Sequence, residues 1–295
     1  MELEIPIKYR LTGHNDIINS IAWSPDSQYL ASVGHDKNVK IWKDGRCIST
    51  LIGHKCSIYS VAWSPDGQYL ATGSWEGIIK IWKDSECIST LLDHVSPIES
   101  LVWSPDSQYL ALGREDGTVN IWKDGQCIST LIGHNNIIKS IAWSPDGQYL
   151  ASGSFDKTVK IWKDDQCIST LTEHRGSISS VSWSPDSQYL ASSSHTIKIW
   201  KDNHCLSTLT GHENFINSVA WSPDGQYLVS GSWDKTVKIW KDDQCISTLT
   251  DHNPKVKSVL WSPDGQYLAS GGLTNNIMIR DTTSLFFPMI KAVDF

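Results

Sequence analysis

Histidines return at even intervals along the chain, and acidic residues follow most of them in the next loop. Imidazole and carboxylate groups are common metal ligands and common proton donors and acceptors in catalysis. A single such set would suit a metal site or acid–base chemistry. Here the set recurs, whereas a catalytic set is needed only once, so we interpret it as scaffold and expect no catalytic residue and no metal. The histidines are His14, His54, His94, His134, His174, His212 and His252.

Other signals of catalysis are absent from the sequence. It contains no glycine-rich phosphate loop, no G-x-S-x-G segment and no H-E-x-x-H segment. The C-x-x-C spacing of many zinc sites is also absent. We therefore expect neither an enzyme nor a bound cofactor.

Cysteine usage bears on burial and on compartment. Because six of the seven cysteines recur at the same place in each segment, we expect them to be small buried apolar side chains. An odd cysteine count, with no apolar segment near the N-terminus, favours a reducing location, the cytoplasm. The six are Cys47, Cys87, Cys127, Cys167, Cys205 and Cys245, and Cys56 is the odd one.

Charge and hydrophobicity limit the class of partner. The net charge is -7, from 25 basic and 32 acidic residues, which argues against the phosphate backbone of a nucleic acid as the main ligand. No apolar run is long enough to cross a membrane. Hydrophobic residues make up 40% of the chain, which is enough for a sizeable core.

A repeat organises the whole chain. The segment W-S-P-D-[G/S]-Q-Y-L occurs seven times, at a spacing of 40 residues with one step of 38. Six copies are followed by I-W-K-D. The first tryptophan of each copy is Trp23, Trp63, Trp103, Trp143, Trp183, Trp221 or Trp261, and the second is Trp42, Trp82, Trp122, Trp162, Trp200 or Trp240.

Each repeat is predicted to form four short strands. In the fourth copy the strands are 138–144, 149–152, 158–162 and 167–171, separated by turns rich in Pro, Asp, Gly and Ser. One four-stranded sheet has little core of its own, but sheets stacked radially bury both faces. We therefore predict an all-β fold, a seven-bladed β-propeller with four antiparallel strands in each blade.

The chain resembles the WD-repeat family over residues 11–281. The Gly-His start, the Trp-Ser-Pro-Asp turn and the tryptophan after the third strand carry the resemblance, although Trp-Lys-Asp replaces the usual Trp-Asp. The resemblance implies one propeller over 1–283, with repeats starting near 13, 53, 93, 133, 173, 211 and 251, and a monomeric ring that is either complete or part of a larger protein or complex.

In this family the two ends of the chain pair in one blade to close the ring. Two segments, Ile7–Leu11 and Leu285–Met289, align with the fourth strand of other blades and compete for that place. We favour the N-terminal segment because it ties the ring shut. Pro288 in the other segment is tolerable only at a sheet edge or outside the sheet. The tail 284–295 would then cap an edge or begin an extension.

The resemblance also gives the recurring histidines a role. In the family, the histidine bonds the loop aspartate, and a hydroxyl and an indole extend the network. The second repeat has a longer acid, Glu76, in place of the aspartate. Leu112, the shortened loop of the fifth repeat (Ser194-His195-Thr196) and Arg280 depart further, so we expect the third, fifth and seventh blades to be less stable. The complete sets are His14, Ser32, Asp36 and Trp42; His134, Ser152, Asp156 and Trp162; and His212, Ser230, Asp234 and Trp240.

The seven copies differ from one another in only a few columns. Two columns follow the histidine and begin the first strand, and a third precedes the loop acid between strands two and three. Antiparallel geometry places all three at one mouth of the channel, which is the family's usual partner-binding rim. From these columns we predict the binding residues His35, Tyr59, Trp75, Glu99, Arg114, Glu115, Lys139, Phe155, Phe215, Trp233, Lys255 and Lys257.

This composition favours recognition of a protein or peptide. Aromatic side chains and arginine are enriched where proteins bind one another. Glu99, Glu115 and Arg114 lie in the third repeat and Lys255 and Lys257 in the seventh, so we expect a rim of uneven charge that orients a peptide. One alternative is a small molecule or carbohydrate stacked on Trp75 and Trp233. Another, less favoured, is a propeller enzyme.

Overall fold

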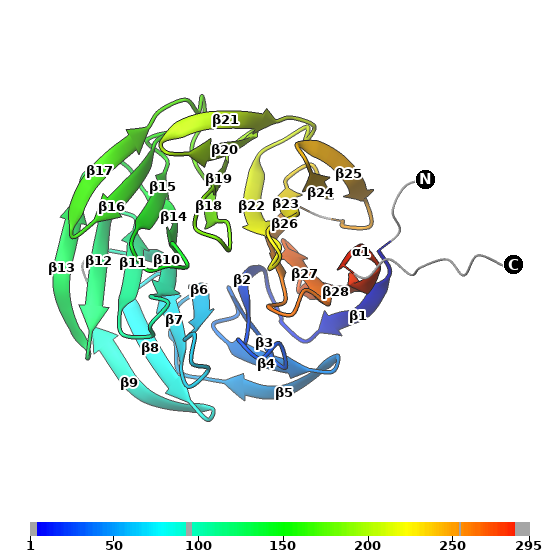
Figure 1. The fold of residues 1–295 in the computed structure, drawn as a ribbon. Coiled ribbons are helices and arrows are strands. Elements are labelled where there is room, and N and C mark those ends of the chain that lie inside the picture. Colours follow the sequence, from blue (N-terminus) through cyan, green and yellow to red (C-terminus); the bar gives the residue numbers. More distant parts are fainter. Residues whose placement is uncertain (1–4, 93–95, 254, 287–295) are drawn as a thin grey trace, which may run out of the picture.

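The computed structural model describes residues 5–92, 96–253 and 255–286. These residues form 28 strands, arranged as seven four-stranded antiparallel sheets, and one short helix. Figure 1 shows the sheets set radially around a central channel, with the first strand of each repeat innermost. The predicted seven-bladed propeller is confirmed.

Six of the blades are continuous in sequence. In blade order, their strands are β2 (Ile18–Trp23), β3 (Leu30–Gly34), β4 (Val39–Lys43), β5 (Arg46–Leu51); β6 (Ile58–Trp63), β7 (Leu70–Ser74), β8 (Ile78–Lys83), β9 (Glu86–Leu92); β10 (Ile98–Trp103), β11 (Leu110–Arg114), β12 (Thr118–Lys123), β13 (Gln126–Ile132); β14 (Ile138–Trp143), β15 (Leu150–Ser154), β16 (Val159–Lys163), β17 (Gln166–Leu171); β18 (Ser180–Trp183), β19 (Leu190–Ser193), β20 (Ile197–Lys201), β21 (His204–Leu209); and β22 (Ile216–Trp221), β23 (Leu228–Ser232), β24 (Val237–Lys241), β25 (Gln244–Leu249).

The seventh blade joins the two ends of the chain. It contains β26 (Val256–Trp261), β27 (Tyr267–Gly272) and β28 (Asn276–Asp281), and its outer strand is β1 (Ile7–Thr12), antiparallel to β28. The N-terminal segment therefore takes the disputed place, as predicted. Leu285 belongs instead to α1 (Thr283–Phe286), where its side chain packs in a core cluster with Ile5. The rest of the predicted tail, 287–295, lies outside the described residues.

The turn after each first strand explains the recurring Ser-Pro-Asp. In the first blade, Ser24 Oγ donates to Asp26 Oδ1 at 2.6 Å, and the backbone N–H of Gln28 donates to the same oxygen at 3.0 Å. The residue directly after the aspartate has a positive φ, 61° at Ser27 and 72° at Gly67. This conformation explains why that position is glycine in some copies and serine in others. The aspartates of this turn therefore stabilise the connection between strands.

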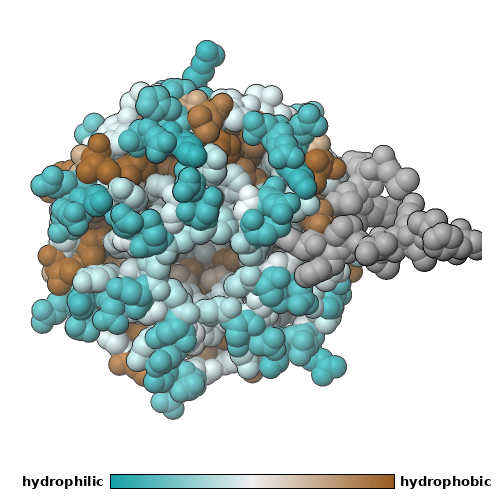
Figure 2. Space-filling view, in the orientation of Figure 1, coloured by the Kyte–Doolittle hydropathy of each residue, from teal (hydrophilic) through white to brown (hydrophobic). Residues whose placement is uncertain are grey.

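The hydrophobic core lies between blades rather than within them. Val33 and Val39 of the first blade pack with Ile58, Val61 and Trp82 of the second, and equivalent clusters follow around the ring. Each sheet thus depends on both neighbours to bury its two faces. In the face seen in Figure 2, the ring is hollowed at its centre and hydrophobic residues gather in patches towards its outer edge.

The expectation of buried cysteines is wrong. Cys47, Cys87, Cys127, Cys167 and Cys245 are exposed, Cys56 and Cys205 are partly exposed, and all seven are free thiols. The six repeating cysteines lie on the fourth strands, which form the outside of the ring and have no neighbouring strand beyond them. Their recurrence therefore does not reflect burial.

In the described part of the chain, no helix has the length and apolar character needed to span a membrane.

Candidate binding site at the channel mouth

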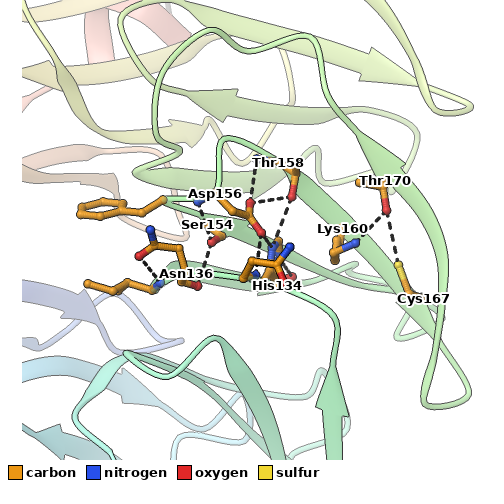
Figure 3. Close-up of polar contacts among 12 residues, drawn as sticks. His134, Asn136, Ser154, Asp156, Thr158, Lys160, Cys167 and Thr170 are labelled. Atoms are coloured by element: carbon orange, nitrogen blue, oxygen red, sulfur yellow. Dashed lines mark hydrogen bonds and ion pairs between the residues drawn. The ribbon is translucent and has the colours of Figure 1, made fainter.

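Each complete histidine set forms one hydrogen-bonded chain from loop to core. In the fourth blade, His134 Nδ1 lies 2.7 Å from Asp156 Oδ2, and His134 Nε2 lies 2.8 Å from Ser152 Oγ (Figure 3 shows His134 and Asp156). The indole of Trp162 donates to Ser152 Oγ at 2.7 Å. Because a carboxylate only accepts, His134 donates from Nδ1 and accepts from the serine at Nε2, as a neutral ring does.

The other complete sets have the same geometry. His14 lies 2.8 Å from Asp36 and 2.6 Å from Ser32, and Trp42 donates to Ser32 at 2.7 Å. Burial lowers the pKa of His14, although Asp36 opposes the shift. The sixth blade repeats these contacts through His212, Ser230, Asp234 and Trp240. A buried neutral imidazole with both nitrogens bonded is suited to holding a loop in place.

The departing blades contain incomplete networks. His54 keeps its bond to Thr72 at 2.7 Å, but Glu76 accepts from the backbone of Lys55 instead of from the ring. Within the described residues, His54 Nδ1 is buried without a partner. In the third blade Leu112 replaces the hydroxyl, and among the described residues the buried indole nitrogen of Trp122 has no hydrogen-bond partner. His94 lies outside the described residues.

In the seventh blade Arg280 replaces the network tryptophan and makes different contacts. Its guanidinium pairs with Asp251 and donates to the backbone carbonyl of Ile5 at 2.7 Å. His252 still bonds Ser270 at 2.8 Å. The fifth blade retains the bonds of Ser192 to His174 and to Trp200, at 2.7 Å each, without a loop aspartate.

Backbone hydrogen bonds join the variable columns directly. The backbone N–H of the residue before the loop acid donates to a backbone carbonyl just before the first strand. His35 donates to Ile17 at 2.9 Å, and Trp75 donates to Ser57 at 3.0 Å. Trp233 donates to Phe215 at 2.9 Å in the same way. The loop between strands two and three and the start of strand one therefore lie side by side in these blades, as antiparallel pairing requires.

One position from each blade contributes to a ring of seven side chains around the channel mouth. All seven line a single cavity of about 540 Å³. We call them the mouth ring: Asn19, Tyr59, Glu99, Lys139, Ser179, Asn217 and Lys257. Of the predicted binding residues, those that line this cavity are Tyr59, Glu99, Lys139, Phe155, Phe215, Trp233 and Lys257.

Aromatic side chains form two groups on this mouth. In one, Tyr59 lies between His35 and Trp75, with ring centroids 6.1 Å and 5.8 Å away. In the other, the ring centroids of Phe215 and Trp233 are 5.5 Å apart, and Lys255 Nζ lies 4.1 Å from the Trp233 ring centroid. Trp75 is 47% exposed and Trp233 is 39% exposed. Large aromatic surface therefore faces solvent on two sides of the mouth.

The expected uneven charge of the rim is partly neutralised. Glu99 forms an ion pair with Lys139 of the next blade, and its side chain is almost fully buried. Burial raises the pKa of Tyr59, and the negative charges of Glu99 and then Glu115 raise it further. The side chain of Glu115 is therefore close enough to the mouth to act on Tyr59. Lys257 donates to the side-chain oxygen of Asn19 across the closure of the ring.

The prediction that Arg114 belongs to the rim is wrong. Its side chain is 1% exposed, donates to the Asn120 side chain and donates to the backbone carbonyl of Ser96 at 3.0 Å. It is the last residue of β11, a position that Ser74 and Ser154 occupy in neighbouring blades, where the side chain faces into the blade. Arg114 therefore belongs to the interior of the third blade.

His195 is a cavity residue that the sequence columns did not supply. It lines the mouth cavity, and its ring centroid lies 5.4 Å from that of Phe215. The shortened loop of the fifth repeat removed it from the alignment of copies. Its place directly after Ser194, in the loop between strands two and three, was the one feature of the sequence that could have assigned it to the mouth.

The chain shares single-repeat segments with longer proteins. It is 44% identical over 43 residues to the ribosome assembly protein 4 of Saccharomyces cerevisiae, covering 14% of this chain and 8% of that protein. It is 46% identical over 35 residues to the Notchless protein homolog of Arabidopsis thaliana (12% and 7%). It is 46% identical over 41 residues to the ribosome biogenesis protein BOP1 homolog of Drosophila melanogaster (13% and 5%). The matched segments span less than a tenth of each relative.

Family models cover most of the described fold. The model for the WD domain, G-beta repeat, matches residues 165–201, 203–241 and 243–281. The model for the WDR19 first beta-propeller matches residues 19–172, just over half of the chain. Together with seven blades of four antiparallel strands, these matches show that the chain belongs to the WD-repeat β-propeller family, a family of protein-interaction scaffolds.

Proposed function

We propose that this protein is a non-catalytic scaffold that binds a protein or peptide at the channel mouth. The observation that carries the proposal is the gathering of the variable aromatic side chains at one end of the ring. The repeats are otherwise nearly uniform, yet Tyr59, Trp75, Phe215 and Trp233 differ from the residues at the same places in most other copies.

Two physical features support binding at this place. The mouth side chains are held on β-strands and on short loops bonded to them, so they lose little conformational freedom when a partner docks. Exposed tryptophans surrounded by polar groups are typical of residues that contribute much of the binding energy at protein interfaces.

The relatives support the class of function and name no partner. Those from yeast and Drosophila melanogaster are named for the assembly or biogenesis of ribosomes. The likeness to each has about the length of one repeat, so we carry over only membership of a protein complex.

A paired capture experiment tests the proposal. Wild-type chain and the double variant Trp75→Ala/Trp233→Ala are used to capture proteins from a lysate of the source cells. We expect the wild type to retain a defined protein that the variant loses, because two large exposed aromatic surfaces are removed.

A matched control separates the mouth from general stickiness. Ile48→Ala/Ile128→Ala removes two apolar side chains, each 54% exposed, from the outer strands of the ring. This control should retain the same protein as the wild type. Equal retention by all three folded chains, or no specific retention by the wild type, would overturn binding through the aromatic mouth.

A further inference from the structure

The mouth ring carries more positive than negative charge, although the whole chain is acidic. It contains one carboxylate, on Glu99, and two ammonium groups, on Lys139 and Lys257. Glu99 and Lys139 form an ion pair and largely cancel. One positive charge, that of Lys257, is left at the entrance of the channel.

Lys257 is held in an unusual environment for a cation. It is partly buried, and within the described residues no carboxylate lies at ion-pair distance from it. Its ammonium group donates to the neutral side-chain oxygen of Asn19, which leaves two of its three N–H groups for other acceptors. Burial, and then the charge of Lys139, lowers the pKa of Lys257 to about 8, while Glu99 opposes the shift.

The aromatic faces at the mouth are already next to the protein's own cations. Lys139 Nζ lies 6.0 Å from the ring centroids of both Tyr59 and Phe155. Lys255 Nζ lies 4.1 Å from that of Trp233. A cationic partner group would have to compete for these faces against the repulsion of three lysines. The mouth is therefore better suited to an anion.

We infer that the mouth cavity receives a carboxylate of the bound peptide, placed beside Lys257 and flanked by the aromatic side chains of Phe215 and Trp233. This inference rests on the proposed function and specifies the chemistry of the partner. A carboxylate would accept from the free N–H groups of Lys257 and supply the opposite charge that this cation lacks. The carboxylate belongs to an Asp or Glu side chain or to the C-terminus of the peptide.

A peptide experiment tests the charge preference. Twelve-residue peptides displayed on phage are selected on the wild-type chain, and the enriched peptides are synthesised with each acidic residue changed to its amide and with free or amidated C-termini. One of these neutralisations should weaken binding at least about tenfold, because it removes a charge-assisted hydrogen bond. The position that responds distinguishes a side chain from a terminus.

Variants of the protein assign the effect to Lys257. Lys257→Met should abolish the difference between the acidic peptide and its amide, and Lys257→Arg should restore it. Lys235→Met is the matched control, since this exposed lysine follows Trp233 in the same loop but does not line the cavity. It should bind both peptides as the wild type does.

The pH dependence has a defined sign. Binding of the carboxylate requires protonated Lys257, so affinity for the acidic peptide should fall as pH rises through about 8. Lys257→Arg should lose this fall, since guanidinium stays charged. The other titratable groups that line the cavity are Tyr59, Glu99, Lys139 and His195, and they remain in every variant.

A second measurement needs no peptide. The lysines are labelled uniformly with ¹³C and ¹⁵N, the Lys257 side-chain signal is assigned with Lys257→Met, and the whole chain is titrated with glutarate. Glutarate should raise the pKa of Lys257 and leave that of Lys235 unchanged.

The outcomes separate the inference from the function on which it rests. Tight peptides that lack acidic groups, or that bind Lys257→Met equally well, would overturn the carboxylate site and leave the scaffold proposal standing. Selection of basic or methylated peptides would mean that the aromatic faces take a cation instead. If no peptide binds through the mouth but glutarate shifts Lys257, the scaffold proposal fails and the anion site remains. If glutarate shifts nothing and no peptide discriminates, the anion site is wrong.

Discussion

The blade histidines differ in how well burial is compensated. In the complete networks, burial lowers the pKa of the ring and an aspartate opposes the shift, as at His134 and Asp156. His54 and His174 have no such aspartate bonded to Nδ1, and burial with a nearby lysine lowers the pKa of each to about 4. These rings stay neutral in the folded state at pH values where free histidine is charged.

This difference predicts acid sensitivity. Between about pH 6.5 and 4, such a histidine is protonated in the unfolded chain but mostly neutral in the folded one. The free energy of unfolding therefore falls as pH drops through that range. Removal of the ring by His54→Gln should reduce the loss of unfolding free energy between pH 7 and 5 by about 2 kcal/mol. Urea unfolding at the two pH values measures it.

His204→Gln is the control for that experiment. This histidine is exposed and lies outside the networks, so its removal should leave the pH dependence as it is in the wild type. An equal effect of the two variants would contradict the assignment of acid sensitivity to the buried rings.

At the scale of the blade, one hydroxyl connects the loop to the core. Ser152 is fully buried and bonds both His134 and the indole of Trp162. Where Leu112 replaces this hydroxyl in the third blade, the indole of Trp122 is left without a partner in the described part of the chain. Blades with complete networks should therefore hold their loops more firmly than the third blade.

Removal of the central hydroxyl measures the value of one network. Ser152→Ala leaves two buried polar groups unsatisfied and should lower the unfolding free energy by about 1 to 3 kcal/mol. Gln166→Ala, which truncates an exposed residue of the same blade, should change it by less than about 0.5 kcal/mol. If the two variants unfold at the same urea concentration, the network contributes nothing to stability.

At the scale of the whole molecule, stability depends on closure. Every sheet packs against two neighbours, and the seventh blade is completed only by β1 from the other end of the chain. Leu11 of β1 is buried against Ile18 and Ile277, which places it between the last blade and the first. The closing strand thus packs as the outer strand of any other blade does.

A matched pair of truncations tests this equivalence. Leu11 and Leu51 hold the same position in the outer strands of the seventh and first blades, and both are buried. Leu11→Ala and Leu51→Ala should each destabilise the chain by about 2 to 5 kcal/mol in thermal or urea unfolding. A large effect of Leu51→Ala alone would mean that the N-terminal strand is not part of the closed ring in solution.

The sequence by itself determined the repeat and therefore the architecture. Four short β-prone runs with turn residues recur seven times, and only a closed ring of sheets buries the faces that such runs create. The alignment of Ile7–Leu11 with Cys47–Leu51 also predicted the closing strand. Local spacing was sufficient for the six continuous blades, because strand pairing within them joins residues that are near in sequence. The closing strand pairs with β28 at the far end of the chain, and its likeness to the other fourth strands predicted it.

Only the tertiary structure decided how individual side chains lie. Arg114 varies among the copies as a binding residue would, but strand alternation turns it into the blade, where Asn120 and a backbone carbonyl receive it. The cysteines recur as core residues would, but the outer strand has no neighbour to cover them. Glu99 and Lys139 are 40 residues apart, and only the packing of the third blade against the fourth brings them together. Closure of the ring brings Lys257 to Asn19, and Lys257 is left without a carboxylate partner among the described residues. Contacts between blades depend on which faces meet, and no single repeat contains that information.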